Sequence, residues 1–172
     1  MLTRPLSIVA FLWVFGCSFM LASEVSFAQQ QPGATVKAAG CVILTPEGIV
    51  LGIGTSFGDI RIPFGSHKTG ETARETAARE TKEETGIDVD VRSLLQTFEN
   101  GSVFLFQCIP AQPIDDYSRL SPVDTSEIAE IIVLDPGTML NHDGRKIKNG
   151  WRYPDDRRLL TGIFQKYKTE LR

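Results

Sequence analysis

The segment from residue 65 to residue 87 constrains this chain more than any other part of its sequence. It reads GSHKTGETARETAARETKEETGI and follows the spacing G-x5-E-x7-R-E-x-x-E-E-x-G, whose defining positions are Gly65, Glu71, Arg79, Glu80, Glu83, Glu84 and Gly86. Residues 71–85 contain no proline or glycine and are rich in residues that lose little conformational freedom on entering a helix. The segment therefore predicts a helix over 71–85 that ends at Gly86, a residue suited to a left-handed C-cap.

Three carboxylates share one face of this predicted helix. At about 100° per residue, Glu83 and Glu84 lie about 60° and 40° to either side of Glu80. Like charges so placed repel, and a divalent cation would remove the repulsion because hard carboxylate oxygens suit Mg2+ or Mn2+. Arg79 precedes Glu83 by one turn and can hold that carboxylate in position. The alternative is an ordinary solvated face, and Glu71 is also explained by the preference of acids for a helix N-terminus.

The spacing resembles the signature box of the Nudix hydrolases. The resemblance implies an α/β fold, namely an α/β/α sandwich with a mixed central sheet, in which the box forms a loop, a helix and a second loop. Two positions depart from the usual pattern. Pro63-Phe64-Gly65 stands where most members have Pro-Gly-Gly, and Thr81 occupies a slot that is normally aliphatic. Neither residue is a candidate ligand, so the departures bear on the substrate pocket rather than on the metal chemistry.

Segments on both sides of the box read as strands of such a sheet. A hairpin signal, Pro46-Glu47-Gly48, joins the first two runs, and residues 59–63 lead into the box. The runs rich in β-forming residues are 36–44, 49–53, 103–109 and 128–134. Behind Asp155, an amphipathic closing helix is predicted by the helical spacing of Leu159, Leu160, Ile163, Phe164, Tyr167 and Leu171.

By resemblance, the chemistry is metal-dependent hydrolysis of a phosphoanhydride bond in a nucleoside-diphosphate-linked or other small diphosphate. Mg2+ or Mn2+ would be bound by Glu80, Glu83 and Glu84, with the Gly65 carbonyl as a further ligand. Bound ions would bridge diphosphate oxygens and lower the pKa of a water that attacks one phosphorus in line. The expected catalytic residues are Glu83, Glu80 and Arg79.

An acidic residue on a loop after the box often assists as a base in this family. Glu127 is the candidate here, with Glu130 and Asp124 as alternatives, although acids before a strand are usually only solvated. The rival function is a catalytically silent Nudix-fold module that binds a ligand. Such modules typically lose one or more box carboxylates, whereas this chain keeps all three, so the sequence favours the enzyme. It does not select a base, sugar or lipid substituent.

The amino terminus predicts export. Arg4 precedes an apolar run over residues 6–22, and Ser26-Phe27-Ala28 matches the small-x-small pattern of a cleavage site. We expect a signal peptide over 1–28, a linker over 29–35 and one catalytic domain over 36–172, secreted or periplasmic. Two alternatives remain open. The apolar run is long enough to stay as an uncleaved inner-membrane anchor, and Gly16-Cys17 weakly resembles a lipid-attachment site.

The net charge of −3 disfavours general binding to nucleic acid polymers or anionic membranes. The expected partner is a small diphosphate, without stable membrane insertion of the mature domain, and a homodimer is compatible with the sequence. Residues 141–158 are locally basic and contain Trp151 and Tyr153. We interpret them as solvated charge around a packed tryptophan, with a phosphate- and ring-binding loop as the alternative.

Loss of the signal peptide would leave Cys41 and Cys108 as the cysteines of the mature chain. An oxidising compartment would permit them to pair and so close a loop of about 67 residues. The Nudix resemblance implies that their strands share the central sheet. The favoured interpretation is two free, buried thiols, because adjacent strands rarely offer disulfide geometry. A disulfide is the alternative.

Overall fold

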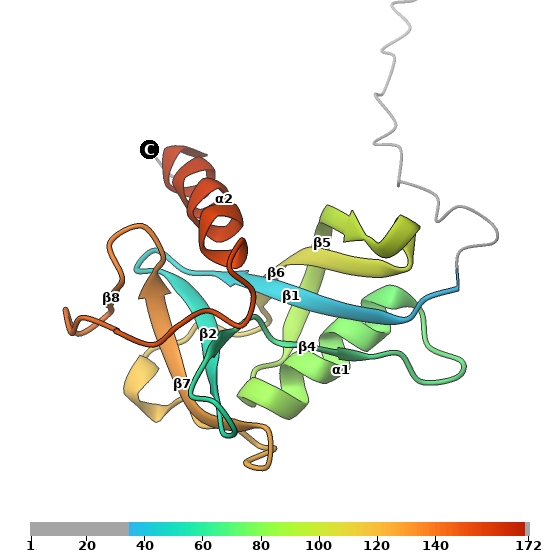
Figure 1. Ribbon diagram of the computed structural model, residues 1–172, viewed down its shortest axis with the longest axis horizontal. Helices are drawn as coiled ribbons and strands as arrows, with labels where there is room; N and C mark the ends of the chain where they lie inside the picture. The colour runs from blue at the N-terminus through green and yellow to red at the C-terminus, as the bar shows by residue number, and fades with distance from the viewer. Residues whose placement is uncertain (1–34, 171–172) are drawn as a thin grey trace, which may run out of the picture. The chain divides into compact units, whose positions relative to one another are not determined.

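The computed structural model describes residues 35–170 (Figure 1). The predicted signal peptide and Cys17 lie outside these residues. Within them, no helix is long and apolar enough to cross a membrane. In chain order the elements are β1 (Ala38–Leu44), β2 (Ile49–Gly54), β3 (Ile60–Arg61), β4 (Phe64–Ser66), α1 (Ala73–Thr85), β5 (Val89–Phe98), the 3-10 turn η1 (Glu99–Gly101), β6 (Val103–Pro110), the 3-10 turn η2 (Tyr117–Arg119), β7 (Ile128–Asp135), β8 (Leu140–Asn141) and α2 (Asp156–Glu170).

The strands form one mixed sheet in the order β5-β6-β1-β2-β7-β8. β1 runs parallel to β6, and the other pairings are antiparallel. Two short strands extend the sheet off this path, because β3 pairs with β2 and β4 pairs with β1. The pairing of β4 with β1 fixes the loop that leads into α1 against the centre of the sheet.

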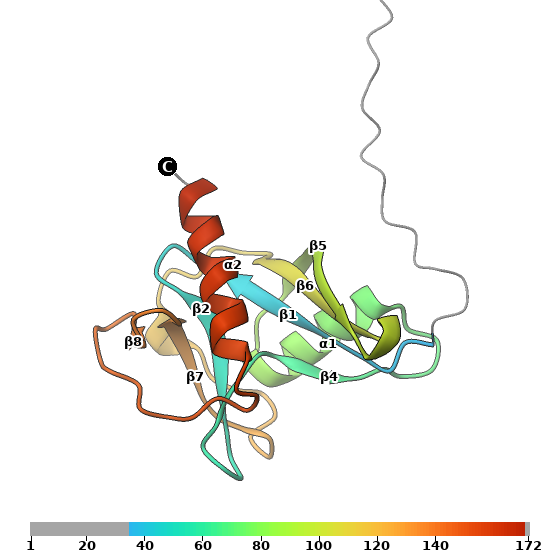
Figure 2. The same cartoon turned by 45° about the horizontal axis from the view of Figure 1, so that its top comes forward.

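Each face of the sheet is covered by one helix, so the sheet has a hydrophobic core on both sides. Along β1, Cys41 and Ile43 point into the core beneath α1, whereas Val42 and Leu44 point into the core beneath α2. This alternation follows from the two-residue period of a strand. Figure 2 shows α2 across one face of the sheet and α1 on the other side, near β4. The predicted α/β/α sandwich with a mixed central sheet is confirmed.

Helix α1 has a capping residue at each end. Thr72 is its N-cap and forms a capping box with Glu75, and Gly86 ends it with φ of 75°. The helix therefore starts two residues later than the predicted Glu71. Glu71 lies in the loop before the N-cap, so the expectation that it belongs to the first helical turn is wrong. Its carboxylate has a different function, described below.

The edge strand β5 is an element that the sequence pattern did not predict. Its residues are largely exposed, and its pairing with β6 contains two irregularities, one on each side of Leu94. A strand of this kind carries little periodic signal, because most of its side chains do not have to be apolar. It forms because β6 offers it an open edge for backbone hydrogen bonding.

Cys41 and Cys108 form a disulfide, which overturns the favoured interpretation of two free thiols. The Cα atoms are 5.5 Å apart, which lies within the range that a disulfide requires. The strands β1 and β6 are direct neighbours, and Cys108 lies opposite Ile43, two residues along β1 from Cys41. This diagonal placement on the same face of the sheet brings the two sulfurs together.

Candidate active site

Arg79 on α1 is the centre of an ion-pair network that spans the loop and the helix. Its Nε donates to Glu71 Oε1 at 2.6 Å, and one terminal nitrogen donates to Glu80 at 2.6 Å and to Glu83 at 2.9 Å. The other terminal nitrogen donates to the Ser66 carbonyl at 2.8 Å and to Glu71. The bond from Arg79 holds the pKa of Glu71 at about 2, and the carboxylates raise the pKa of Arg79. Glu71 therefore anchors Arg79, and Arg79 orients the carboxylates of Glu80 and Glu83.

Glu80 and Gly65 are in close contact. A Cβ atom at residue 65 would overlap the Glu80 carboxylate, so that only glycine leaves room for the glutamate at this point. Burial raises the pKa of Glu80, and the hydrogen bond from Arg79 opposes that increase. The box loop and the box helix thus meet at a glycine and a partly desolvated carboxylate.

Glu84 is the most deeply buried of the three box carboxylates, with 6% of its surface exposed. Its Oε2 accepts a hydrogen bond from the Phe64 backbone N–H at 3.1 Å. Burial raises the pKa of Glu84 to about 8, and the charges of Glu80 and Glu127 add to the increase. A buried carboxylate with one hydrogen-bond donor and two acidic neighbours is a place where a cation would be stabilised.

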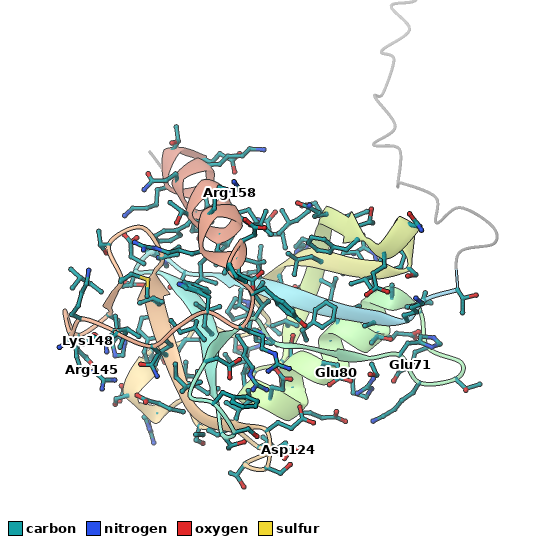
Figure 3. The ribbon with its side chains drawn as sticks, viewed as in Figure 1. Glu71, Glu80, Asp124, Arg145, Lys148 and Arg158 are labelled. Atoms are coloured by element: carbon teal, nitrogen blue, oxygen red, sulfur yellow. A yellow bond between two sulfur atoms is a disulfide. The ribbon has the colours of Figure 1, made fainter. Side chains whose placement is uncertain are left out.

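Glu83 is the most exposed of the three carboxylates, and it lies in a cleft of about 490 Å³. Its second oxygen is 3.3 Å from the Lys68 ammonium. The cleft is lined by the predicted box residues Gly65, Arg79, Glu80, Glu83 and Glu84, together with Ala38, Phe64, Ser66, His67, Lys68, Asp124 and Glu127. The fold thus gathers the box side chains on one concave surface, near the Glu80 label in Figure 3.

The three candidate loop acids have different positions. Glu127 lines the same cleft as Glu84. Asp124 also lines it, but its carboxylate accepts two hydrogen bonds from Ser126. Glu130 pairs instead with Arg145 at 2.9 Å, and Figure 3 shows Arg145 and Lys148 far from Glu71 and Glu80. Glu127 is therefore the candidate whose position best suits a role beside the box.

A second, larger cleft of about 720 Å³ adjoins the first, and Glu84 and Glu127 line both. Arg61 lines this larger cleft, but both of its hydrogen bonds go to Asp59, each at 2.9 Å. The hydrogen bonds from Arg61 lower the pKa of Asp59. Sequence reasoning missed Arg61 as a cleft residue. Its location just before the box was the one available signal.

The basic stretch over residues 141–158 divides into two parts. Trp151 packs against the core beneath α2, as the favoured interpretation expected. Arg145 is exposed and pairs with Glu130, also as expected of solvated charge. Arg152 and Tyr153, however, line the larger cleft. The packed tryptophan and the solvated charge are thus confirmed, and binding of a phosphate or a ring by this stretch stays a prediction.

The two departures from the usual box also have structural counterparts. The Phe64 ring covers Gly40 on β1, and its backbone N–H is the donor to Glu84 described above. Thr81 is fully buried, and its hydroxyl has no hydrogen-bond partner among residues 35–170. The missing partner of Thr81 has no explanation in the structure.

The donor set of the box fits a hard divalent cation. Glu80 and Glu84 are partly desolvated carboxylates with raised pKa values, and Glu83 is beside them. In the part of the chain that the structure describes, no three acidic, histidine or cysteine side chains already converge as metal ligands. Arg79 holds the carboxylates of Glu80 and Glu83 at 2.6 Å and 2.9 Å.

Comparison with known proteins gives a family and a set of similar folds. Residues 34–151 match the model of the NUDIX domain. No curated protein matches the chain. Among solved structures, a UDP-X diphosphatase is 19% identical, with a TM-score of 0.56 over 77% of this chain and 64% of its own length. The chain thus spans less than two thirds of that protein.

Two further structures are similar over most of their length. A NUDIX hydrolase from Nitrosomonas europaea is 19% identical, with a TM-score of 0.54 over 80% of this chain and 91% of its own. An ADP-ribose pyrophosphatase from Streptococcus suis 89-1591 is 15% identical, with a TM-score of 0.53 over 73% of this chain and 89% of its own length. Because the sequence identities are only 15% and 19%, these two comparisons show a similarity of fold alone.

Proposed function

The chain belongs to the Nudix hydrolase family, and from that premise we propose that it is a metal-dependent hydrolase of phosphoanhydride bonds in small diphosphates. The observation that carries the proposal is the meeting of Gly65, Glu80, Glu83 and Glu84 in one cleft, ordered by Arg79. The similar structures named as a diphosphatase and an ADP-ribose pyrophosphatase are consistent with it.

The cation, Mg2+ or Mn2+, would be held by Glu80, Glu83 and Glu84, with the Gly65 carbonyl as a further ligand. When bound, it supplies neutralisation of the diphosphate charge and makes an attacking water more acidic. Arg79 keeps Glu80 and Glu83 on the cleft side of α1, and Glu71 keeps Arg79 in place. These fixed charges reduce the reorganisation that the reaction requires.

Glu127 would accept the proton of the attacking water. Its place in both clefts supports this role, because the attacked phosphorus would lie between the box carboxylates and the larger cleft. The larger cleft would hold the group attached to the diphosphate. At about 720 Å³ it has the size of a pocket for a small organic ligand.

The test is phosphate or monophosphate release by the purified protein with Mg2+, across nucleotide sugars, dinucleotides, nucleoside triphosphates and aliphatic diphosphates. Glu83→Gln should lower turnover by about 100-fold or more while the protein stays folded. Glu130→Gln is the matched control, because it makes the same change outside both clefts and should retain parental activity. Parental turnover by Glu83→Gln would contradict the role assigned to the box.

The alternative is a catalytically silent Nudix-fold module. The complete set of box carboxylates argues against it, because a silent module has no need of a crowded buried acid such as Glu84. Turnover separates the two functions. A silent module would bind a diphosphate stoichiometrically and release no product.

We also propose that the protein is exported and cut after Ala28, so that residues 1–28 are a signal peptide. The Cys41–Cys108 disulfide supports an oxidising compartment, where such bonds persist. Intact-mass measurement on protein from the native host tests this. The expected mature chain begins at Gln29, whereas a chain beginning at Met1 in the membrane fraction would favour an anchor. A lipid on Cys17 would favour a lipoprotein.

A further inference from the structure

The turn between β5 and β6 contains an asparagine followed by a glycine (Figure 1). Asn100 and Gly101 lie within η1, and Asn100 is exposed. In such a pair the glycine has no side chain to hinder attack of its backbone nitrogen on the preceding side-chain amide. Asn149 and Gly150 form a second exposed pair of the same kind, in the loop before α2. The chain therefore provides an internal comparison between two identical dipeptides.

The backbone of η1 is held in an unfavourable conformation. Glu99, Asn100 and Gly101 have φ angles of 46°, 57° and 84°, so consecutive residues are left-handed. Glycine adopts this conformation freely and asparagine tolerates it, but it is unfavourable for a glutamate. A hydrogen bond that closes the turn, from the Ser102 N–H to the Glu99 carbonyl, is long at 3.3 Å. The backbone strain therefore favours local opening of this exposed turn.

The side-chain amide of Asn100 is not restrained by the turn. The side-chain hydrogen bonds around it belong to its neighbours, because Lys37 donates to the Glu99 carboxylate at 3.0 Å and Ser102 Oγ donates to the Glu99 carbonyl at 2.9 Å. The Asn100 amide makes no hydrogen bond to any of residues 35–170. The ψ angle of Asn100 is 33°, which turns the Gly101 nitrogen away from the Asn100 Cβ. Local opening of the turn is thus the step that brings the two groups together.

Asn149 is fixed to the sheet although it is equally exposed. Its Nδ2 donates to the Gly58 carbonyl at 2.7 Å. The carbonyl of Gly150 accepts from the Ile60 N–H at 2.7 Å, and the Arg152 N–H donates to the Ile60 carbonyl at 2.9 Å. These bonds hold both the side-chain amide and the backbone that follows it. They must break before the Gly150 nitrogen can approach the Asn149 amide.

We propose that Asn100 is a site of spontaneous deamidation, whereas the fold protects Asn149. The Gly101 backbone nitrogen attacks Asn100 Cγ, and the new N–C bond forms as the Cγ–Nδ2 bond breaks. Ammonia leaves with the proton of the Gly101 N–H. Water then opens the five-membered imide at either of its carbonyl carbons, which yields aspartate or isoaspartate at residue 100.

The reaction adds a negative charge beside Glu99. Lys37 pairs with Glu99, and both side chains are exposed. Lys37 and Glu99 also line the larger cleft. A carboxylate at residue 100 therefore increases the negative charge at the rim of that cleft as the protein ages. The isoaspartate product also lengthens the main chain between β5 and β6, because the chain then passes through the Cβ atom.

The experiment incubates the purified protein in mildly alkaline buffer and follows each asparagine by peptide mapping with mass spectrometry. Deamidation raises the mass of a peptide by about 1 Da. In the folded protein, residue 100 should convert about tenfold or more faster than residue 149, because hydrogen bonds hold Asn149. In urea with reductant, where the fold is lost, the two residues should convert at similar rates.

Three results would overturn the proposal. They are an absence of conversion at residue 100, equal rates at the two residues in the folded protein, and a ratio of rates that stays the same in urea. The last result would assign the difference to the neighbouring residues in the sequence rather than to the fold.

Variants assign the new charge to residue 100. Anion-exchange chromatography of the aged parent should show an acidic form, and unaged Asn100→Asp should elute close to it. Asn100→Gln should suppress this form, because glutamine would have to close a six-membered ring. Asn149→Gln is the matched control and should leave the rate of its appearance unchanged. An acidic form that persists at the parental rate in Asn100→Gln, or that is suppressed by Asn149→Gln, would overturn the proposal.

Discussion

The carboxylate of Glu80 fills the space into which a side chain at residue 65 would project. The backbone of Gly65 is not in the left-handed region, so the need for glycine here is a need for space. From this place Glu80 reaches the Arg79 guanidinium at 2.6 Å. The glycine of the box loop and the carboxylate of the box helix are therefore one packing unit.

Gly65→Ala should displace Glu80 and disturb its contact with Arg79. A misplacement of about 1 Å in a catalytic group is enough to lower turnover by about 100-fold. Gly162→Ala is the matched control. Gly162 lies on α2 with open space around it, so this variant should keep full activity and gain about 0.5–1 kcal/mol of stability. Steady-state kinetics and urea unfolding check both variants, and parental kinetics for Gly65→Ala would contradict the packing argument.

Removal of divalent ions should abolish activity in the purified domain. Mg2+ or Mn2+ should restore it, and Ca2+ should restore less, because its larger and looser coordination shell suits a tight phosphate-bridging site poorly. Metal should also raise the melting temperature, since it binds the folded state. Differential scanning fluorimetry and product release, each with and without chelator, measure the two effects. Full activity in excess chelator would exclude the proposed mechanism.

Glu84 should make the metal-free protein less stable as the pH rises. Burial raises its pKa to about 8 in the folded state, against 4.5 for an ordinary glutamate. Between these values the folded protein holds a proton that the unfolded chain has released, so the free energy of unfolding falls as the pH increases. Below a pH of 4.5, Glu84 is protonated in both the folded and the unfolded state, so it causes no loss of stability there. Glu84→Gln removes the titrating group and should flatten the dependence.

Urea unfolding at a series of pH values from 5 to 8, in chelator, measures this dependence. The comparison between parent and Glu84→Gln isolates the contribution of this residue from those of other groups. Identical slopes for the two proteins would contradict the assigned pKa shift.

The Cys41–Cys108 disulfide should contribute strongly to stability. It joins residues 67 positions apart, and the chain-entropy model assigns a loop of this size up to about 4 kcal/mol. The Cys41→Ala/Cys108→Ala double variant, or the parent unfolded in reductant, should therefore unfold at lower urea concentration. Thiol titration of the unfolded, oxidised protein provides the direct check. Two free thiols there, in protein from the native host, would show that the bond does not form.

Much of the candidate site was predictable because its pattern is local. The spacing of Glu80, Glu83 and Glu84 places them on one helix face whatever surrounds the helix, and Gly86 ends that helix as predicted. The apolar runs on both sides of the box also predicted four of the principal strands. Side-chain periodicity and helix geometry act over a few residues, so the sequence contains this information directly.

The tertiary structure alone decided which distant residues meet. The disulfide depends on the parallel pairing of β1 with β6, and β5 exists because β6 offers it an edge. Glu71 holds Arg79 rather than capping a helix, because the box loop folds back along α1. The bond from Phe64 to Glu84 and the position of Arg152 beside β3 likewise join segments far apart in the chain. Such contacts depend on strand register and packing across the whole domain, which no local pattern in the sequence encodes.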